Sequence, residues 1–417
     1  MNGPLALGVD IGTGGVRAAC IDKAGAEVGL AAADMAEFGP DRRDPAVWDA
    51  ALGAALSRLG DQVDLSRVGA VSVDGTSGTV LALDAGGAPV GTALMYNDAV
   101  DDADLVARIA AAAPQDTAAR GATSALIRAI ALQDRPGVAR IVHQADWIAE
   151  RLSGRPGPSD ESNALKTGYD PVTRRWPGWL SATPLMTELL PAVIPAGDVS
   201  GRASGAYGLA KDALLVAGVT DGCASFLATG SSAPGDAVTA LGTTMTIKLL
   251  SDSPIFAPEY GIYSHRIGDL WLAGGASNTG GGVLAAHFSA AQIADLSGRI
   301  DPNAKSGLDY YPLTEPGERF PIADPAYPPR LSPRPDDDAA FLHGMLEGIA
   351  RIEALSHQRL AALGAPRPLA VRTVGGGARN DVWTAMRARI LDAEMADAES
   401  VEAAVGVARL ARARLPA

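Results

Sequence analysis

The 417-residue chain is predicted to be an α/β protein with two lobes. Near the N-terminus a short apolar strand ends in an acid, Asp10, and a glycine turn, and a similar pattern begins again after residue 214, around Asp221. Strand–turn–helix segments occur in both halves, and a chain of this length suits two domains better than one. We place the predicted domains at residues 1–212 and 213–417.

Composition narrows the class of protein. The chain is 47% hydrophobic and 20% charged, so it can bury sizeable cores, and a net charge of −13 without a basic run argues against a nucleic-acid partner. Its five histidines and two cysteines lack the spacing of a zinc site or a disulfide framework. No window approaches about eighteen apolar residues, so we expect no membrane span and a cytoplasmic location.

The first half opens with two apolar runs, at residues 5–9 and 16–21, joined by a glycine-rich loop. They predict a β-hairpin, because a Rossmann fingerprint needs a helix directly after its glycines and the spacing Gly12-x-Gly14-Gly15 lacks the third glycine of GxGxxG. The other segments expected here are a helix at 45–59, a strand at 68–73 that pairs with 80–83, helices at 124–132 and 144–152, surface loop over 153–179 and turns over 191–207.

The second half repeats the order of strand, acid, glycine turn and strand. Residues 9–13 and 240–244 form a short internal echo, one in each half. The segments expected after it are a loop at 310–335, a long helix at 340–363, a strand at 369–374 and an amphipathic helix at 378–391.

Three glycine turns and one carboxylate are the features of the sequence that indicate its chemistry. The turns lie at residues 7–15, 239–245 and 374–380, and Asp221 lies between the first two in the chain. Two turns with donor-rich backbone, a third that opens a helix, and an acid suit a nucleoside triphosphate site with a base that activates a hydroxyl. The alternative for Asp221 taken alone is an acid that shapes the turn before Gly222.

These runs, in this order, resemble the FGGY carbohydrate kinases, a branch of the actin-like ATPase (ribonuclease H-like) fold, over nearly the whole chain. The matching motifs are the first phosphate motif at 10–13, the catalytic-base motif at 218–225, the second phosphate motif at 241–244, the adenosine motif at 375–383, and flanking runs at 159–164, 317–321 and 346–350. The resemblance implies two α/β lobes with the nucleotide in the interlobe cleft, ATP and Mg²⁺ as cofactors, and a monomer or homodimer.

The same resemblance distributes the functions between the predicted domains. Residues 1–212 would bind the sugar and carry the first phosphate turn. Residues 213–417 would carry the base, the second phosphate turn and the adenosine site.

The nucleotide would contact all three turns. Backbone N–H groups, together with threonine hydroxyls, would bind phosphate at Gly12, Thr13, Gly14, Gly15, Gly242, Thr243 and Thr244. The third turn would place ribose or phosphate against Gly376 and Gly377. Asn380 would form a hydrogen bond with the adenosine, and Trp383 would line the site of the adenine ring. The alternatives are ordinary hairpin turns for the phosphate motifs and a core role for Trp383.

Two acids would act on the reacting groups. Asp221 is the predicted general base, within reach of a sugar hydroxyl, and Asp10 would orient Mg²⁺ through water and face the substrate. Asp10 has the alternative of a turn cap. The histidines, including His143 and His265, lack an evident partner in the sequence and are interpreted as structural.

The sugar pocket departs from the family pattern. The loop at 74–79 resembles compact D-ribulose kinases rather than the His-Gly-Gln or Gly-Gln-Met-His loops of xylulose kinases, and Tyr96-Asn97-Asp98 replaces the usual Trp-Gln-Asp. Ser77, Tyr96 and Asp98 are the predicted sugar contacts; Ser77 has the alternative of a turn cap, and Asp98 that of a member of an acidic run. The predicted reaction is phosphorylation of the primary hydroxyl of a ketopentose, with D-ribulose first, D-xylulose second and another polyol third.

Two further classes share part of this pattern. An actin-like ATPase without small-molecule phosphorylation would have the phosphate turns but no need for Asp221 beside a polar sugar loop. A sugar-responsive regulator would be expected to add a helix-turn-helix or a basic patch, and the sequence shows neither.

Overall fold

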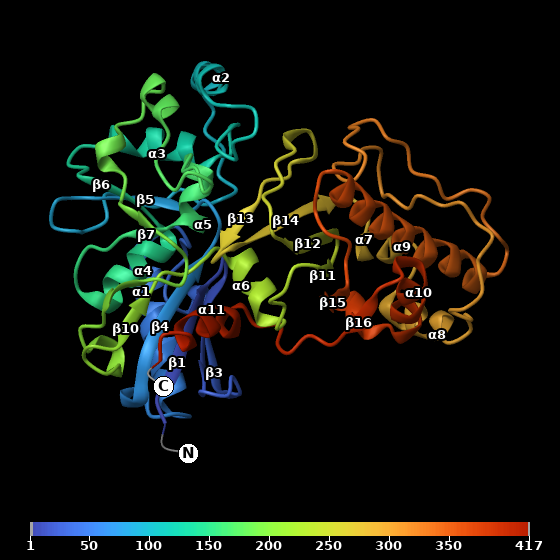
Figure 1. Cartoon of the computed structure of the whole chain (residues 1–417), viewed down its shortest axis with the longest axis horizontal. Helices are drawn as coiled ribbons and strands as arrows, with labels where there is room; N and C mark the ends of the chain where they lie inside the picture. The colour runs from blue at the N-terminus through green and yellow to red at the C-terminus, as the bar shows by residue number, and fades with distance from the viewer. Residues whose placement is uncertain (1–2, 416–417) are drawn as a thin grey trace. The chain divides into compact units, whose positions relative to one another are not determined.

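The computed structural model describes residues 3–415, which form two compact units (Figure 1). The first unit comprises residues 3–230, 265–269 and 400–415, and the second comprises 231–264 and 270–399. Each unit is built around its own mixed β-sheet covered by helices.

The sheet of the first unit combines an antiparallel meander with parallel strands. Its order is β3 (Glu27–Asp34), β2 (Gly15–Ile21), β1 (Leu5–Ile11), β4 (Val68–Gly75), β10 (Leu214–Val216) and β9 (Val199–Arg202). Strands β1 and β2 form the predicted antiparallel hairpin, whereas β4 runs parallel to both β1 and β10. The carboxyl ends of β1, β4 and β10 therefore lie along one edge.

Alternate side chains of β1 pack into two different hydrophobic clusters, one on each face of the sheet. Leu5, Leu7, Val9 and Ile11 pack into the main core with helix α1 (Pro45–Gly60) and α4 (Gln144–Ser153). Ala6 faces the other way, toward α11 (Ala403–Arg412), in a separate cluster of small residues. Because side chains alternate along a strand, Gly8 and Asp10 share the α11 face with Ala6.

The backbone of helix α11 is in direct contact with the backbone of the sheet on one side and of a neighbouring helix on the other. A Cβ added to Gly8 would lie 1.8 Å from Ala404 O, and one added to Gly406 would lie 1.8 Å from Ala224 O of α6 (Asp221–Ala228). Only glycine leaves room for such contacts. The C-terminal helix is thereby fixed directly behind the strand that carries Asp10 (Figure 1).

The rest of the first unit forms a smaller layer with its own core. It contains the two-stranded sheets β5–β6 and β7–β8, strand β13 and three helices: β5 (Val80–Leu83), β6 (Arg140–His143), β7 (Ser159–Asp160), β8 (Val193–Ile194), β13 (His265–Ile267), α2 (Ala103–Ala112), α3 (Ala125–Gln133) and α5 (Glu161–Ala164). The prediction that 80–83 pairs with 68–73 is wrong, because β5 pairs antiparallel with β6. Their sequence adjacency suggested a hairpin, but the polar loop between them turns β5 out of the main sheet.

The sheet of the second unit repeats the topology of the first. Its strands in this unit follow the order β14 (Leu270–Ser277), β12 (Met245–Ser251), β11 (Asp236–Leu241), β15 (Ala370–Val374) and β16 (Glu394–Ala396). As in the first unit, the leading strand forms an antiparallel hairpin on one side and pairs in parallel on the other. The echo between residues 9–13 and 240–244 thus marks equivalent hairpin turns.

The second unit contains the two helices predicted for the second half of the chain, at 340–363 and 378–391, and also two helices that are not among the predicted segments. They are α7 (Gly281–Ala285), α8 (Ala290–Ser297), α9 (Asp338–Ala362) and α10 (Asp381–Leu391). The expected helix at 378–391 divides into a 3₁₀ turn, Gly376–Arg379, and α10, because Asn380 has extended backbone and caps α10. Residues 310–335 contain no helix or strand, as predicted.

The compact units differ from the predicted domains in three places. The division falls after Gly230 rather than after residue 212, so Asp221 lies in the first unit, and residues 265–269 and α11 also belong to that unit. The physical reason is packing, since β10 extends the first sheet and α6 packs on α11. Among residues 3–415, no helix is long and apolar enough to span a membrane.

Gly8→Ala is expected to destabilise the first unit by about 2–3 kcal/mol, because the added methyl group overlaps a backbone carbonyl that cannot move without shifting α11. Urea denaturation followed by tryptophan fluorescence measures this change. Gly201→Ala in β9 is the matched control, since no atom lies within 4 Å of the position that its added methyl group would take. Equal midpoints for the two variants would contradict close packing of α11 at Gly8.

Candidate active site

Three acids lie at the carboxyl ends of parallel segments of the first unit. The register pairs Asp10, near the end of β1, with Asp74, near the end of β4. Thr220 pairs in parallel with Gly75, which places Asp221 just beyond the same edge. Neighbouring parallel strands deliver their following residues to one place, and ligands commonly bind there. The structure thus gathers the predicted Asp10 and Asp221 and adds Asp74, whose charge interacts with both.

Asp74 is not among the predicted site residues. The signal in the sequence is its place at the end of a buried apolar strand, which it shares with Asp10. It is 0% exposed, and neither of its oxygens accepts a hydrogen bond from a described donor group. Burial and the neighbouring Asp10 and Asp221 carboxylates raise the pKa of Asp74 well above its ordinary value. A protonated Asp74 can donate a hydrogen bond to Asp10.

Asp10 faces Asp74 from the neighbouring strand. Burial raises the pKa of Asp10, but the hydrogen bond with Asp74 and the Arg17 guanidinium oppose the shift. Arg17 Nη1 lies 3.5 Å from Asp10 Oδ2, and Arg17 Nε lies 3.5 Å from Oε2 of Glu402, the residue before α11. No three His, Cys, Asp or Glu side chains within residues 3–415 are grouped to hold a metal ion on their own.

Asp221 is the first residue of α6 and is half-buried. Its Oδ1 accepts a hydrogen bond from Gly222 N at 2.7 Å. The positive end of a helix favours a charged carboxylate. The hydroxyl of Thr220 donates to Cys223 Sγ at 3.4 Å, so Cys223 is a buried packing partner in this turn.

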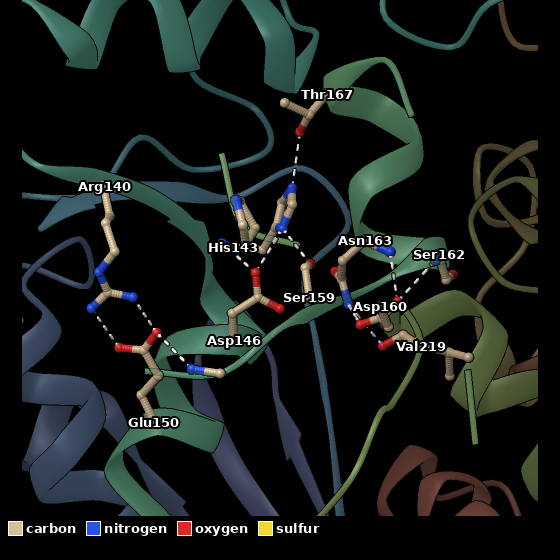
Figure 2. A network of polar contacts seen from close by, with 12 residues as sticks. Arg140, His143, Asp146, Glu150, Ser159, Asp160, Ser162, Asn163, Thr167 and Val219 are labelled. Atoms are coloured by element: carbon tan, nitrogen blue, oxygen red, sulfur yellow. Dashed lines mark hydrogen bonds and ion pairs between the residues drawn. The ribbon is translucent and has the colours of Figure 1, made fainter. Parts of the chain in front are cut away.

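Residues 159–163 hold the backbone that leads into Asp221 (Figure 2). Asn163 Nδ2 donates to Val219 O at 3.3 Å, and Thr220 N donates to Ser162 Oγ at 3.3 Å. Asp160 accepts from Ser162 N, Asn163 N and Asn163 Nδ2 at 2.7–2.9 Å. The prediction of surface loop over 153–179 is wrong for residues 159–163, because they are buried and bond to the segment before Asp221.

Burial and the Asp146 charge raise the pKa of Asp160 to about 7, and the donors from Asn163 oppose this shift. Asp146 also accepts from His143 Nδ1 at 2.8 Å, and the other ring nitrogen of His143 lies 2.9 Å from Thr167 Oγ1 (Figure 2). His265 Nδ1 lies 3.0 Å from Ser162 Oγ. The expectation that these histidines lack partners is wrong, since both are bonded inside this network.

The predicted sugar residues lie on two loops that one buried arginine joins. Arg128 of α3 donates to the carbonyls of Gly78, Tyr96 and Asp98 at 2.8–3.1 Å. Ser77 Oγ is buried without a described partner, whereas the Tyr96 side chain is 43% exposed. Asp98 Oδ2 accepts from Met95 N at 2.8 Å, so this carboxylate also shapes its own loop.

The first phosphate turn is open to solvent at its tip. Gly12, Gly14 and Gly15 are partly exposed and Thr13 is exposed, and Gly12 N donates to Gly15 O at 3.0 Å. None of the three glycines has a positive φ, so left-handed backbone is not the reason for glycine at this turn. Close approach does require glycine at Gly15, where a Cβ would lie 2.6 Å from Ala33 O.

The second phosphate turn is packed between two other glycine runs of the second unit. Gly242, Thr243 and Thr244 are exposed, and Gly281 N and Gly282 N donate to the carbonyls of Gly242 and Thr243 at 2.8 and 2.9 Å. Residues 280–282 are absent from the predicted site; three consecutive glycines at the start of α7 are the signal that identifies them.

A pocket of about 860 Å³ opens beside this turn, wholly within the second unit. Its lining combines glycine turns with apolar side chains of α7 and α8 and includes Gly242, Thr243, Leu284, Ile293, Ala294, Gly376, Gly377, Asn380 and Trp383. The volume and the apolar lining suit a nucleoside. The structure thus gathers the predicted residues of the second and third turns around one cavity, except Thr244, which does not line it.

Asn380 and Trp383 are engaged within the protein as well as lining this pocket. Asn380 Oδ1 accepts from Trp383 N at 3.0 Å, and its Nδ2 donates to Ser297 Oγ at 2.9 Å. Trp383 is 2% exposed, and its Nε1 donates to Leu346 O at 3.1 Å. Trp383 is therefore a core residue whose edge reaches the pocket wall beside Gly377.

Solved structures with the same arrangement of elements identify the fold. The chain superimposes on xylulose kinase from Rhodospirillum rubrum with a TM-score of 0.82 at 23% identity, and on Plasmodium falciparum glycerol kinase with ADP with a TM-score of 0.83 at 15% identity. Each covers 98% of this chain and 89% of the other. The two units therefore have the actin-like fold of the FGGY sugar kinases.

Sequence comparison gives the family. Residues 237–414 match the FGGY family of carbohydrate kinases, C-terminal domain. The chain is 28% identical to xylulose kinase of Streptomyces coelicolor over 91% of this chain and 82% of that protein, and 26% identical to xylulose kinase of Escherichia coli over 97% and 89%. The chain thus resembles the FGGY carbohydrate kinases, by the family model over residues 237–414 and by its xylulose kinase relatives over most of its length, and these similarities identify it as an ATP-dependent sugar kinase.

Asp74→Asn is expected to preserve the fold and to flatten the dependence of stability on pH. The folded-state pKa of Asp74 lies above its unfolded value of about 3.9, so its contribution to stability is fully present below about pH 4 and is lost as the pH rises through the folded-state pKa. Asn cannot ionise, and its Nδ2 can still donate to Asp10. Urea denaturation from acid to neutral pH should therefore show wild type losing stability relative to this variant.

Asp212→Asn, at an exposed turn of the same unit, is the control for loss of one acid. Parallel stability curves for wild type and Asp74→Asn over this pH range would contradict a proton held on Asp74.

Proposed function

We propose that the protein transfers the γ-phosphate of ATP to the primary hydroxyl of a ketopentose, with Asp221 as general base. The observation that carries the proposal is the half-buried Asp221 at the start of α6, beside the buried pair Asp10 and Asp74. The second unit supplies a cavity of nucleoside size next to an exposed, donor-rich turn. A sugar-independent ATPase would need the cavity but not an acid next to a polar sugar loop.

The choice of ketopentose rests on two observations that point to different sugars. The relatives named xylulose kinase favour D-xylulose. The loop at 74–79 resembles that of compact D-ribulose kinases and favours D-ribulose. Within this loop, the amide and the hydroxyl of Thr76 both donate to Gln144 Oε1. We retain D-ribulose as the first candidate and D-xylulose as its alternative.

In the proposed reaction Asp221 accepts the proton of the sugar hydroxyl as that oxygen attacks the γ-phosphorus. The segment from Asp160 to Asn163 fixes the backbone before Asp221, so the carboxylate needs little reorganisation. The raised pKa of Asp74 favours its neutral form, which reduces the negative charge that the phosphates would meet at this site. The exposed N–H groups of the two hairpin turns are suited to phosphate oxygens.

The family implies Mg²⁺ with the nucleotide, and the residues present fit it. Asp10 supplies carboxyl oxygens, the ligand type that Mg²⁺ prefers, and no protein cage competes for the ion among the described residues. Mg²⁺ commonly binds through one carboxylate, water and substrate phosphates. When bound, the ion would neutralise phosphate charge, and Asp10 would hold it through water while Asp74 orients the Asp10 carboxylate.

Asp221→Asn is expected to lower kcat by about 10²–10⁴ while leaving the KM values for ATP and sugar within a few-fold, because removing a general base affects the transition state more than ground-state binding. A coupled ADP-release assay against D-ribulose, D-xylulose, other pentuloses, pentitols, glycerol and aldoses measures this effect and the sugar preference. Asp212→Asn is the control and should retain full activity.

ADP release from wild type that no sugar stimulates would refute the proposed function. Turnover with D-xylulose in place of D-ribulose would keep the mechanism and reject the interpretation of the loop at 74–79. Full activity of Asp221→Asn would reject the assigned base.

Ala294→Trp is expected to raise the KM for ATP by about tenfold or more, a loss of about 1.4 kcal/mol in binding, because the indole would fill the pocket that Ala294 lines. The KM for sugar should stay unchanged. Ala291→Trp is the matched control, since Ala291 is exposed on the same helix but does not line the pocket. Equal effects of the two variants would show that the cavity is not the ATP site.

A further inference from the structure

Arg128 is a fully buried arginine whose guanidinium binds only backbone oxygen in the described network. It lies on α3 and is 0% exposed. Its Nε and Nη2 donate to Gly78 O at 3.1 and 2.8 Å, and its Nη1 donates to Tyr96 O and Asp98 O at 3.0 Å each. Three carbonyls from two loops therefore converge on one rigid, planar cation.

The energetic setting of Arg128 is unusual for a buried charge. None of the ion pairs found within residues 3–415 involves it, and the Asp98 charge acts on it only from a distance. Burial lowers the pKa of Arg128 to about 10, so the group is still protonated at neutral pH. Carbonyl dipoles are what compensate the lost hydration. Burying a cation without an ion-pair partner costs free energy. The benefit that the structure offers in return is that Arg128 holds the segments whose carbonyls it binds.

The bound carbonyls belong to the two loops that carry the candidate sugar residues. Gly78 follows Ser77, while Tyr96 and Asp98 are themselves candidates. Gly78 has φ +97°, and a Cβ there would lie 2.9 Å from Arg128 Nη2, so glycine at this position admits the guanidinium. A second link joins the same loops, since Tyr96 N donates to Thr79 Oγ1 at 3.1 Å.

Ser77 Oγ supplies an independent indication of a polar ligand. The atom is buried and has no hydrogen-bond partner among the described residues. A buried hydroxyl without a partner is costly, and a substrate hydroxyl or water satisfies it. Its position in the chain is adjacent to the Gly78 carbonyl that Arg128 binds through two nitrogens.

We propose that Arg128 is a positioning residue that fixes the turn at Ser77–Gly78 against the loop at Tyr96–Asp98 and so sets the affinity for the sugar. The inference rests on the proposed function, because it takes these two loops as the sugar site. Arg128 acts through the loops and does not itself touch the substrate.

Arg135 offers a matched comparison in the same layer of the first unit. It follows α3, and its Nη1 donates to Val90 O and Thr92 O at 2.9 and 2.8 Å. Burial lowers the pKa of Arg135 as well. It is thus a second arginine bound to backbone carbonyls, but neither Val90 nor Thr92 is a candidate sugar contact.

The test compares Arg128→Lys and Arg128→Met with Arg135→Lys and Arg135→Met in the full chain. Arg128→Met should raise the KM for the preferred ketopentose between about tenfold and a hundredfold, with the KM for ATP changed less than about twofold, since loop misplacement weakens only the group that the loops hold. Arg128→Lys should give a smaller rise, because an ammonium can keep some but not all of the carbonyl bonds. Both Arg135 variants should keep wild-type sugar kinetics even where their Tm falls.

Amide hydrogen exchange gives a readout that does not depend on turnover. Peptides covering residues 76–80 and 94–99 should exchange faster together in the Arg128 variants and stay protected in the Arg135 variants. Unchanged exchange in these peptides, or a sugar KM that rises equally in both arginine series, would overturn the inference. Absence of sugar-stimulated activity in wild type would refute the proposed function instead, and exchange would then decide alone whether Arg128 fixes the loops.

Discussion

The parallel pairing of β1 with β4 is the constraint on which the rest of the site depends. It places Asp10 and Asp74 side by side, and the continuation of the same edge through Gly75 and Thr220 delivers Asp221. A shift of one residue in this register would turn one acid to the opposite face of the sheet. Large apolar residues on the α1 face and small ones on the α11 face oppose such a shift, because the two faces are not interchangeable.

Small residues allow the helices behind the sheet to sit close to the acids. Gly8 and Gly406 bring α11 against β1 and α6, and Gly218 approaches Val73 O just before the base segment. In this way the end of the chain stabilises the strand that carries Asp10 and the helix that begins at Asp221. Residues from three distant parts of the sequence thus form one rigid support for the acids.

The second unit has the same strand order as the first but carries different residues at the ends of its strands. Its sheet carries glycine turns in place of acids, and these turns line a nucleoside-sized pocket. Behind the turns, Thr239 and Thr373 are register partners on β11 and β15, and each bonds to the buried pair Glu353–Arg387. Burial opposes ionisation of Glu353, but Arg387 keeps its pKa below the ordinary value. The pair therefore connects α9 and α10 to the strands that deliver the turns.

The sequence by itself determined most of the local elements, the hairpins at residues 5–21 and 236–251, and the resemblance to the FGGY carbohydrate kinases, because hydrophobic period, glycine turns and short motifs are local properties. Tertiary structure alone decided the role of Asp74, the burial of residues 159–163 and the place of Arg128. Asp74 acquires its raised pKa only from burial beside two other acids. Ser162 and Asn163 look like loop residues until the segment before Asp221 packs on them. The unit boundary was misplaced for the same reason, since the return of α11 depends on packing between residues about 400 positions apart and leaves no local signal in the chain.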